Sequence, residues 1–150
     1  MRDKPHVMIV EARFYEDIAD ELVRGAVGAL EAAGASFERF AVPGAFEIPG
    51  AIRLALDAGT GDGEPRFDGF IALGCVIRGE TNHYDYVCGE SVRGLQELAV
   101  RHKASIGFGI LTVETREQAW ERAGVDRRNK GRDAAEACLA MIALGREFGG

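Results

Sequence analysis

The sequence predicts an α/β fold in which a four-stranded parallel sheet lies between two layers of helices, a three-layer αβα sandwich. Short runs of consecutive apolar residues recur along the chain, and such runs are typical of strands that are covered on both faces. A segment with apolar residues at helical spacing follows each run, and strands that alternate with helices form parallel sheets. Because the crossovers between parallel strands are right-handed, few topologies remain open.

Four segments are predicted to be strands. Residues 7–10 and 69–77 are continuously apolar, so both strands are expected to be buried on both faces. Residues 36–42 alternate between apolar and polar side chains, which is the period of a strand with one exposed face. The fourth predicted strand covers residues 105–113.

Local signals mark the ends of the predicted helices. Gly34 is expected to end the first helix, since glycine is common just after a helix C-terminus. Pro49 is expected in the first turn of the second helix, and Thr115 is expected to cap the fourth helix. The last helix is expected to follow a break around Gly124 and Gly131.

Length and composition exclude several classes of protein. The chain has 150 residues, and its only linker-like segment, residues 58–68, is too short to separate two domains, so we expect one domain over residues 1–150. The net charge of −6 disfavours a nucleic acid as the main partner. No apolar run approaches the roughly 18 residues of a membrane span, and no signal peptide is apparent, so we expect a cytoplasmic protein without a membrane partner.

The cysteines and histidines suggest neither a disulfide framework nor a metal site. Cys75, Cys88 and Cys138 lie far apart and are odd in number, so we expect free thiols in a reducing compartment. The histidines have no Cys or His neighbour at the spacing of metal ligands, and we therefore expect no metal.

Ligands of parallel α/β sheets bind at the carboxyl ends of the strands. The candidate functional residues therefore lie in residues 12–14, residues 43–47, residues 78–83 and the segment that follows residue 112. The third of these is small and polar and leads directly into a helix, an arrangement that favours an anion through free backbone N–H groups. His83 stands at this helix start, either as a proton carrier or as a structural or surface histidine.

The other candidate segments also leave two interpretations open. Phe46 and Glu47 stand between prolines and glycines, which suits a flat ligand with polar edges or a rigid turn in which Glu47 caps a helix. Phe14 and Phe108 could stack on a planar ligand or pack in the core. The basic stretch from Arg122 to Arg132 could bind phosphate or be a solvated loop.

Taken together, these segments resemble the lumazine synthase family of riboflavin biosynthesis, in family order and over nearly the whole chain. The matching segments are Ala12-Arg13-Phe14, Val42 to Pro49, Leu73 to Asp85, Phe108 to Thr112, Glu117-Gln118-Ala119, Arg122-Ala123-Gly124 and Asn129-Lys130-Gly131. The resemblance implies a flavodoxin-like fold and a transferase that uses no cofactor. It implies condensation of 5-amino-6-(D-ribitylamino)uracil with (S)-3,4-dihydroxy-2-butanone 4-phosphate to 6,7-dimethyl-8-(D-ribityl)lumazine, phosphate and water.

The resemblance also implies roles for individual residues. His83 matches the family histidine that shuttles protons, and Phe14 matches the aromatic residue that stacks on the pyrimidine. The remaining matches are Ala45, Phe46 and Glu47 for the ring and the ribityl hydroxyls, Cys75, Val76 and Ile77 for the pyrimidine pocket, Glu80, Thr81 and Arg122 for the phosphate, Phe108 as an aromatic residue from the neighbouring subunit, and Lys130 with Asp133 near the ribityl chain.

Family sites lie between adjacent subunits of a homopentamer, so the resemblance implies a homo-oligomer with small-molecule substrates. Members that assemble shells of twelve pentamers usually carry a glycine in the turn between the last two helices, where this chain has Arg128. This difference favours a free pentamer, with a decamer as the alternative. Two further hypotheses are a module that binds a flavin or lumazine without turnover and a scaffold for assembly. His83 and Arg122 argue against the binding module, and the complete set of pocket residues argues against the scaffold.

Overall fold

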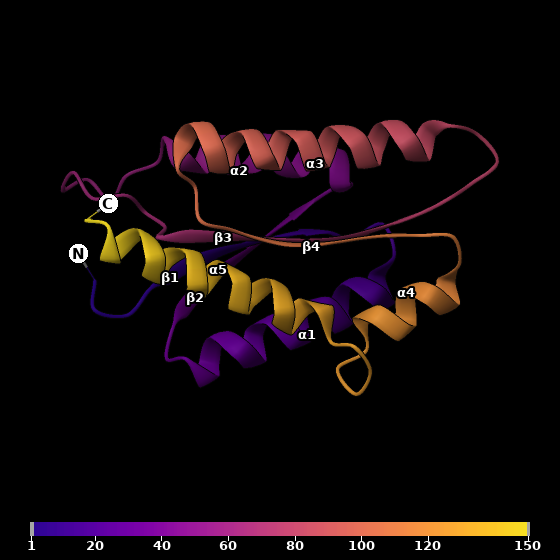
Figure 1. Cartoon of the computed structure of the whole chain (residues 1–150), viewed down its shortest axis with the longest axis horizontal. Coiled ribbons are helices and arrows are strands. Elements are labelled where there is room, and N and C mark those ends of the chain that lie inside the picture. Colours follow the sequence, from indigo (N-terminus) through magenta and orange to yellow (C-terminus); the bar gives the residue numbers. More distant parts are fainter. Residues whose placement is uncertain (1, 150) are drawn as a thin grey trace.

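The structure, a computed structural model that describes residues 2–149, has a central four-stranded sheet between two helical layers (Figure 1). Residues 1 and 150 of the expected domain lie outside the described residues. In chain order the elements are β1 (His6–Ala12), α1 (Glu16–Ala32), β2 (Ser36–Val42), the 3-10 helix η1 (Ala45–Glu47), α2 (Ile48–Leu56), β3 (Gly69–Ile77), α3 (His83–His102), β4 (Ile106–Val113), α4 (Arg116–Ala123) and α5 (Lys130–Glu147). All neighbouring strands are parallel, in the order β2-β1-β3-β4, which confirms the predicted fold class.

The sheet separates two hydrophobic cores. Helices α2 and α3 lie over one face, and α1, α4 and α5 lie over the other (Figure 1). Alternate side chains of β1 enter different cores, with Val7 and Ile9 on the side of α1 and α5, and Met8 and Val10 on the side of α2 and α3. All four are buried, as predicted for a strand that is covered on both faces.

Most element boundaries follow the local sequence signals. Strands β2 and β3 begin and end at the predicted residues. Gly34 follows α1 with φ at +73°, a left-handed conformation that glycine adopts without a steric penalty. The Oγ1 atom of Thr115 accepts a hydrogen bond of 3.1 Å from the backbone N–H of Gln118, as expected of a helix N-cap. Strand β1 continues past its predicted end at Val10 to Ala12.

The predicted break before the last helix is present over residues 124–129, with Gly124 directly after α4, but Gly131 lies inside the first turn of α5. Its role is to let two helices approach closely. A Cβ atom at this position would stand 2.0 Å from the backbone oxygen of Leu22 in α1. Asn129 provides the helix start instead, since its Oδ1 atom accepts a hydrogen bond from the backbone N–H of Arg132.

Replacement of Gly131 by alanine should therefore lower the free energy of unfolding by about 1–3 kcal/mol, the usual cost of overpacking, or by more if the backbone cannot shift. The new Cβ would clash with backbone atoms of Leu22 and not with a flexible side chain. Urea denaturation should be compared with that of Gly145→Ala in the same helix, where a new Cβ meets no atom within 4 Å. An equal effect of both substitutions would contradict this explanation.

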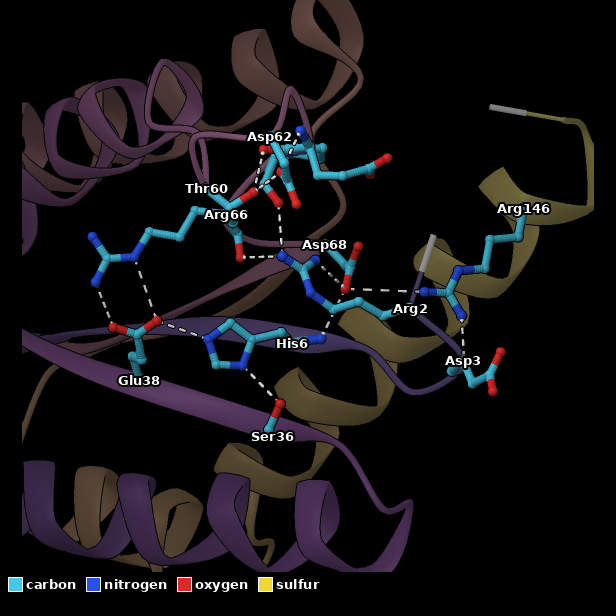
Figure 2. A network of polar contacts seen from close by, with 12 residues as sticks. Arg2, Asp3, His6, Ser36, Glu38, Thr60, Asp62, Arg66, Asp68 and Arg146 are labelled. Carbon is cyan, nitrogen blue, oxygen red and sulfur yellow. Dashed lines mark hydrogen bonds and ion pairs between the residues drawn. The ribbon is translucent and has the colours of Figure 1, made fainter.

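A polar network joins the N-terminal segment, β2 and the loop before β3 at the amino ends of the strands (Figure 2). The His6 ring contacts Ser36 Oγ through Nδ1 and Glu38 Oε2 through Nε2, each at 2.7 Å. Asp68 Oδ2 accepts hydrogen bonds from the backbone N–H of His6 at 2.8 Å and from Arg2 at 3.0 Å. Arg146 of α5 joins this network, because its Nη1 atom donates to the backbone oxygen of Asp3 at 3.2 Å. The network therefore lies at the amino ends of the strands, opposite the segments that carry the candidate residues. Within residues 2–149, no helix is both long and apolar enough to cross a membrane.

Candidate active site

A cavity of about 560 Å³ lies at the carboxyl ends of β1 and β3. These two strands are neighbours in the middle of the sheet, and the chain leaves β1 toward β2 on one side before it returns to β3 on the other. Ligands of open α/β sheets bind at such a reversal of strand order. The lining residues are Phe14, Tyr15, Gly44, Ala45, Phe46, Glu47, Cys75, Val76, Ile77, Gly79, Thr81, His83, Tyr84 and Val87.

The cavity brings together nine of the fourteen predicted site residues from three separate segments: Phe14, Ala45, Phe46, Glu47, Cys75, Val76, Ile77, Thr81 and His83. Glu80 lies between two lining residues, Gly79 and Thr81. The other four, Phe108, Arg122, Lys130 and Asp133, are outside this lining. The roles of all fourteen residues remain predictions.

The aromatic side chains of the site are not core residues. Phe14 is 74% exposed and Phe46 is 57% exposed, although both line the cavity. Phe108 is 49% exposed. The alternative that Phe14 and Phe108 pack in the core is therefore wrong, and their rings are open to a ligand or to another chain.

The carboxylate of Glu47 is not used as a helix cap in the described structure. Glu47 stands at the N-cap position of α2, yet its side chain makes no capping hydrogen bond, so the helix-capping alternative is wrong. Its carboxylate is exposed at the cavity, beside the backbone of Gly44. A carboxylate there can accept hydrogen bonds from the hydroxyl or ring N–H groups of a ligand.

The turn between β3 and α3 presents His83 at the first residue of the helix. The backbone N–H of His83 donates a hydrogen bond of 3.3 Å to Thr81 Oγ1, and its imidazole has no partner among residues 2–149. Arg78 braces the turn, because its guanidinium lies 4.2 Å from the ring centroid of Tyr84 and its Nε atom is 3.0 Å from Glu114. The turn therefore holds an exposed imidazole beside the start of a helix, where partial positive charge favours an anion.

Cys75 lines the cavity but is poorly suited to act as a nucleophile. Burial raises the pKa of its thiol to about 12, so the thiol stays protonated at neutral pH. The remaining lining groups include a carboxylate and an imidazole, which can orient a ligand and transfer protons without Cys75. Among the described residues there is no group of three or more His, Cys, Asp or Glu side chains placed to hold a metal ion.

The four predicted residues outside the lining belong to other surfaces. Phe108 lines a second, larger hollow of about 910 Å³ that runs along α3 and also contains Val92 and Val100. The guanidinium of Arg122 donates to the backbone oxygen of Gln118 within α4 at 3.1 Å.

Lys130 and Asp133 form one ion pair on the first turn of α5, with Nζ 3.5 Å from Oδ2. Both residues are predicted to contact the region of the ribityl chain of the substrate. Their side chains are partly exposed, so the geometry leaves them accessible to another group.

A buried charge cluster next to Phe14 was not predicted from the sequence. Glu11 in β1 is 2% exposed, and its carboxylate accepts hydrogen bonds of 2.8 and 2.9 Å from Arg39 in β2 and of 2.6 Å from Arg13. Burial raises the pKa of Glu11, but the hydrogen bonds from Arg39 and Arg13 outweigh burial and the net pKa is lowered. Glu11 is a charged residue at the end of an apolar strand, and this was the sequence signal that could have indicated oppositely charged partners beside it.

This pKa shift predicts acid sensitivity. Since the folded pKa of Glu11 lies below its ordinary value of 4.5, ionised Glu11 contributes its full stabilisation above pH 4.5, and this contribution is lost as the pH falls through the folded pKa. Urea midpoints measured from pH 7 to pH 3 should therefore fall less steeply for Glu11→Gln than for the wild type, because glutamine cannot take up the proton. If the urea midpoints of the two proteins fell in parallel with pH, ionised Glu11 would not contribute to the stability of the fold.

Five further lining residues were not predicted: Tyr15, Gly44, Gly79, Tyr84 and Val87. Each adjoins or lies near a predicted residue along the chain, so their segments could be identified although the individual side chains could not. Tyr84 directly follows His83 and lines the cavity beside it. Its ring also contacts the guanidinium of Arg78, which itself lies outside the lining.

Comparison with known proteins identifies the family to which this site belongs. The family model of 6,7-dimethyl-8-ribityllumazine synthase matches residues 4–146. The proteins of that name from Bartonella tribocorum and Agrobacterium fabrum are each 56% identical to this chain, over 99% and 98% of its length and 95% and 99% of theirs. The protein of that name from Methylorubrum extorquens is 57% identical over 93% of this chain and 80% of its own length.

The family model covers both strand ends that form the cavity and the turn that carries His83. The relatives match over nearly the full chain at more than half identity. The resemblance described from the sequence is confirmed, and the chain belongs to the 6,7-dimethyl-8-ribityllumazine synthase family.

Proposed function

We propose that the chain is a transferase that condenses 5-amino-6-(D-ribitylamino)uracil with (S)-3,4-dihydroxy-2-butanone 4-phosphate. The products are 6,7-dimethyl-8-(D-ribityl)lumazine, phosphate and water, in the penultimate step of riboflavin biosynthesis. The observation that carries the proposal is the cavity, which joins an exposed aromatic ring, a free carboxylate, a helix-start turn and an imidazole in a chain of this family.

The reaction needs orientation and proton transfer more than covalent catalysis. The amine attacks the ketone, water leaves to form a Schiff base, phosphate is eliminated, and the second ring closes with loss of a second water. Each step moves a proton, and holding the two substrates together converts their encounter into a unimolecular reaction. The protonated thiol of Cys75 is consistent with a reaction without a cysteine nucleophile, and the exposed imidazole of His83 is consistent with proton transfer.

The proposed roles are those that the family resemblance gives to these residues. Phe14 stacks on the pyrimidine, and the segment Ala45–Glu47 holds its edge and the ribityl hydroxyls. Residues 75–77 line the ring pocket through backbone groups. Thr81 and the neighbouring Glu80 place backbone N–H groups near the phosphate, where the start of α3 favours negative charge. His83 carries protons between the reacting atoms.

We further propose that the active form is a homopentamer in the cytoplasm, as a domain over residues 1–150, with sites between adjacent subunits. Phe108 then enters the cavity of the neighbouring copy. The exposed apolar side chains of Phe108, Val92 and Val100 in the hollow along α3 support a partner at this surface, because apolar groups gain free energy when they leave water. Arg122, Lys130 and Asp133, which do not line the cavity of their own chain, depend on the same assembly for their proposed roles.

The function is tested by mixing purified protein with both substrates and following the fluorescence of the lumazine product. Turnover is expected, and sedimentation should give the mass of five copies. Tight binding of lumazine or a flavin by the assembled protein without turnover would support a binding module instead. A mass of sixty copies would show that Arg128 does not prevent shell formation.

A further inference from the structure

We infer that Arg13 is a positioning residue, whose guanidinium holds the turn between β1 and α1 so that Phe14 faces the cavity. The inference rests on the proposed function for the identity of the ligand, a planar pyrimidine. It concerns a contact set outside the cavity lining, since Arg13 itself is absent from that lining.

Phe14 is weakly packed, and its orientation therefore needs another source. The ring is 74% exposed, and its aromatic contact in the described chain is an edge-on approach to Tyr15, with ring centroids 4.9 Å apart. A side chain with so little packing is not oriented by the core. Its direction must come from the backbone of the short turn that carries it, residues 13–15, between β1 and α1.

One guanidinium spans this turn. Its Nη1 atom is 2.6 Å from Glu11 in β1, on the near side of Phe14. Its Nε and Nη2 atoms are 3.0 and 2.7 Å from Glu16 in the first turn of α1, and Nη2 also contacts Asp20 one turn further on. Because its planar donors point in fixed directions, an arginine that binds several carboxylates fixes their relative positions.

The strand end of this bridge is rigid. Glu11 is buried and is also bound by Arg39 in β2 through two hydrogen bonds of 2.8 and 2.9 Å. Arg13 is therefore bound directly to β1 and to two turns of α1, and through Glu11 it is connected to β2. The hydrogen bond to Asp20 raises the pKa of Arg13, as do those to Glu16 and Glu11, whereas burial lowers it. The hydrogen bonds outweigh burial, so the guanidinium is permanently charged.

The contacts on the helix side contribute little to folding. Glu16 and Asp20 are 70% and 67% exposed, and ion pairs with exposed carboxylates add little stability. Glu11 keeps the two hydrogen bonds from Arg39 when Arg13 is removed. Loss of Arg13 should thus loosen the turn and leave the rest of the fold in place, which separates a positioning role from a purely structural one.

The test is a double-mutant cycle between Arg13→Gln and Phe14→Ala in the full-length protein. Arg13→Gln should weaken binding of the pyrimidine substrate about tenfold, equivalent to about 1.4 kcal/mol, in an otherwise wild-type chain. It should have no further effect in Phe14→Ala. In Arg13→Gln, the KM of the phosphate substrate should not change, and the melting temperature should fall by no more than about 5 °C. The conservative variant Arg13→Lys should restore only part of the affinity for the pyrimidine. Arg53→Gln, which removes a surface ion pair to Asp57, is the control.

Amide hydrogen exchange of residues 13–16 tests the same inference without a ligand. Faster exchange in Arg13→Gln than in Arg53→Gln is expected, with protection of β1 and β3 unchanged. An equal loss of affinity in the wild-type and Phe14→Ala backgrounds, or unchanged exchange at the turn, would overturn the inference. Failure of the wild-type protein to form lumazine would instead overturn the proposed function, while the exchange experiment would still decide the role of Arg13.

Discussion

Replacing His83 by alanine should lower kcat by about 100- to 10,000-fold, the usual contribution of a positioned acid or base. The imidazole is exposed at the start of α3, lines the cavity and has no partner among the residues that the structure describes. Removing it should therefore leave the fold and the ring pocket intact. The KM of the pyrimidine should change by no more than about twofold, the pattern expected when an interaction used only in the transition state is lost.

Single-turnover fluorescence with both substrates measures the chemical step, and equilibrium titration with the lumazine product measures binding. His102→Ala is the matched control, because this histidine ends the same helix and lies outside the cavity lining. A normal rate in His83→Ala would remove His83 from the proton-transfer role. A weakened pyrimidine complex with an unchanged rate would assign His83 to binding alone.

Replacing Arg122 by alanine should weaken use of the phosphate substrate by about 2–5 kcal/mol, as for loss of one partner of a desolvated, hydrogen-bonded charge pair. Arg122 is half-buried, and its one side-chain hydrogen bond in the described chain goes to the backbone oxygen of Gln118 at 3.1 Å. No carboxylate pairs with it within residues 2–149. Its remaining donors are therefore available for a phosphate.

The effect should appear as a higher KM for the phosphate substrate and as weaker inhibition by inorganic phosphate. Pyrimidine binding should stay unchanged. Arg127→Ala is the control, because Arg127 already pairs with Glu121 at 3.0 Å and should leave both constants unaltered. If the two variants behave alike, the phosphate contact must be assigned to the turn at Thr81 and not to Arg122.

Local sequence signals were sufficient for the elements and for much of the cavity. The alternation in β2 and the continuous apolar run of β3 marked both strands with their correct ends, and Thr115 marked the start of α4. These signals depend on the backbone and on neighbours a few residues away. The rule that ligands meet the carboxyl ends of parallel strands then brought Phe14, Phe46 and His83 to one place before any pairing of strands was known.

Contacts between distant residues were decided only by the tertiary structure. The strand order β2-β1-β3-β4 put Glu11 beside Arg39, 28 residues away, and turned a charge in an apolar run into the anchor of the Phe14 turn. The same folding placed Gly131 against Leu22, where a helix crossing and not a helix break explains the glycine. Periodicity determined the elements of this protein because it is a short-range property of the chain, whereas the partner of a buried charge and the closest approach of two helices depend on which segments the whole fold makes neighbours.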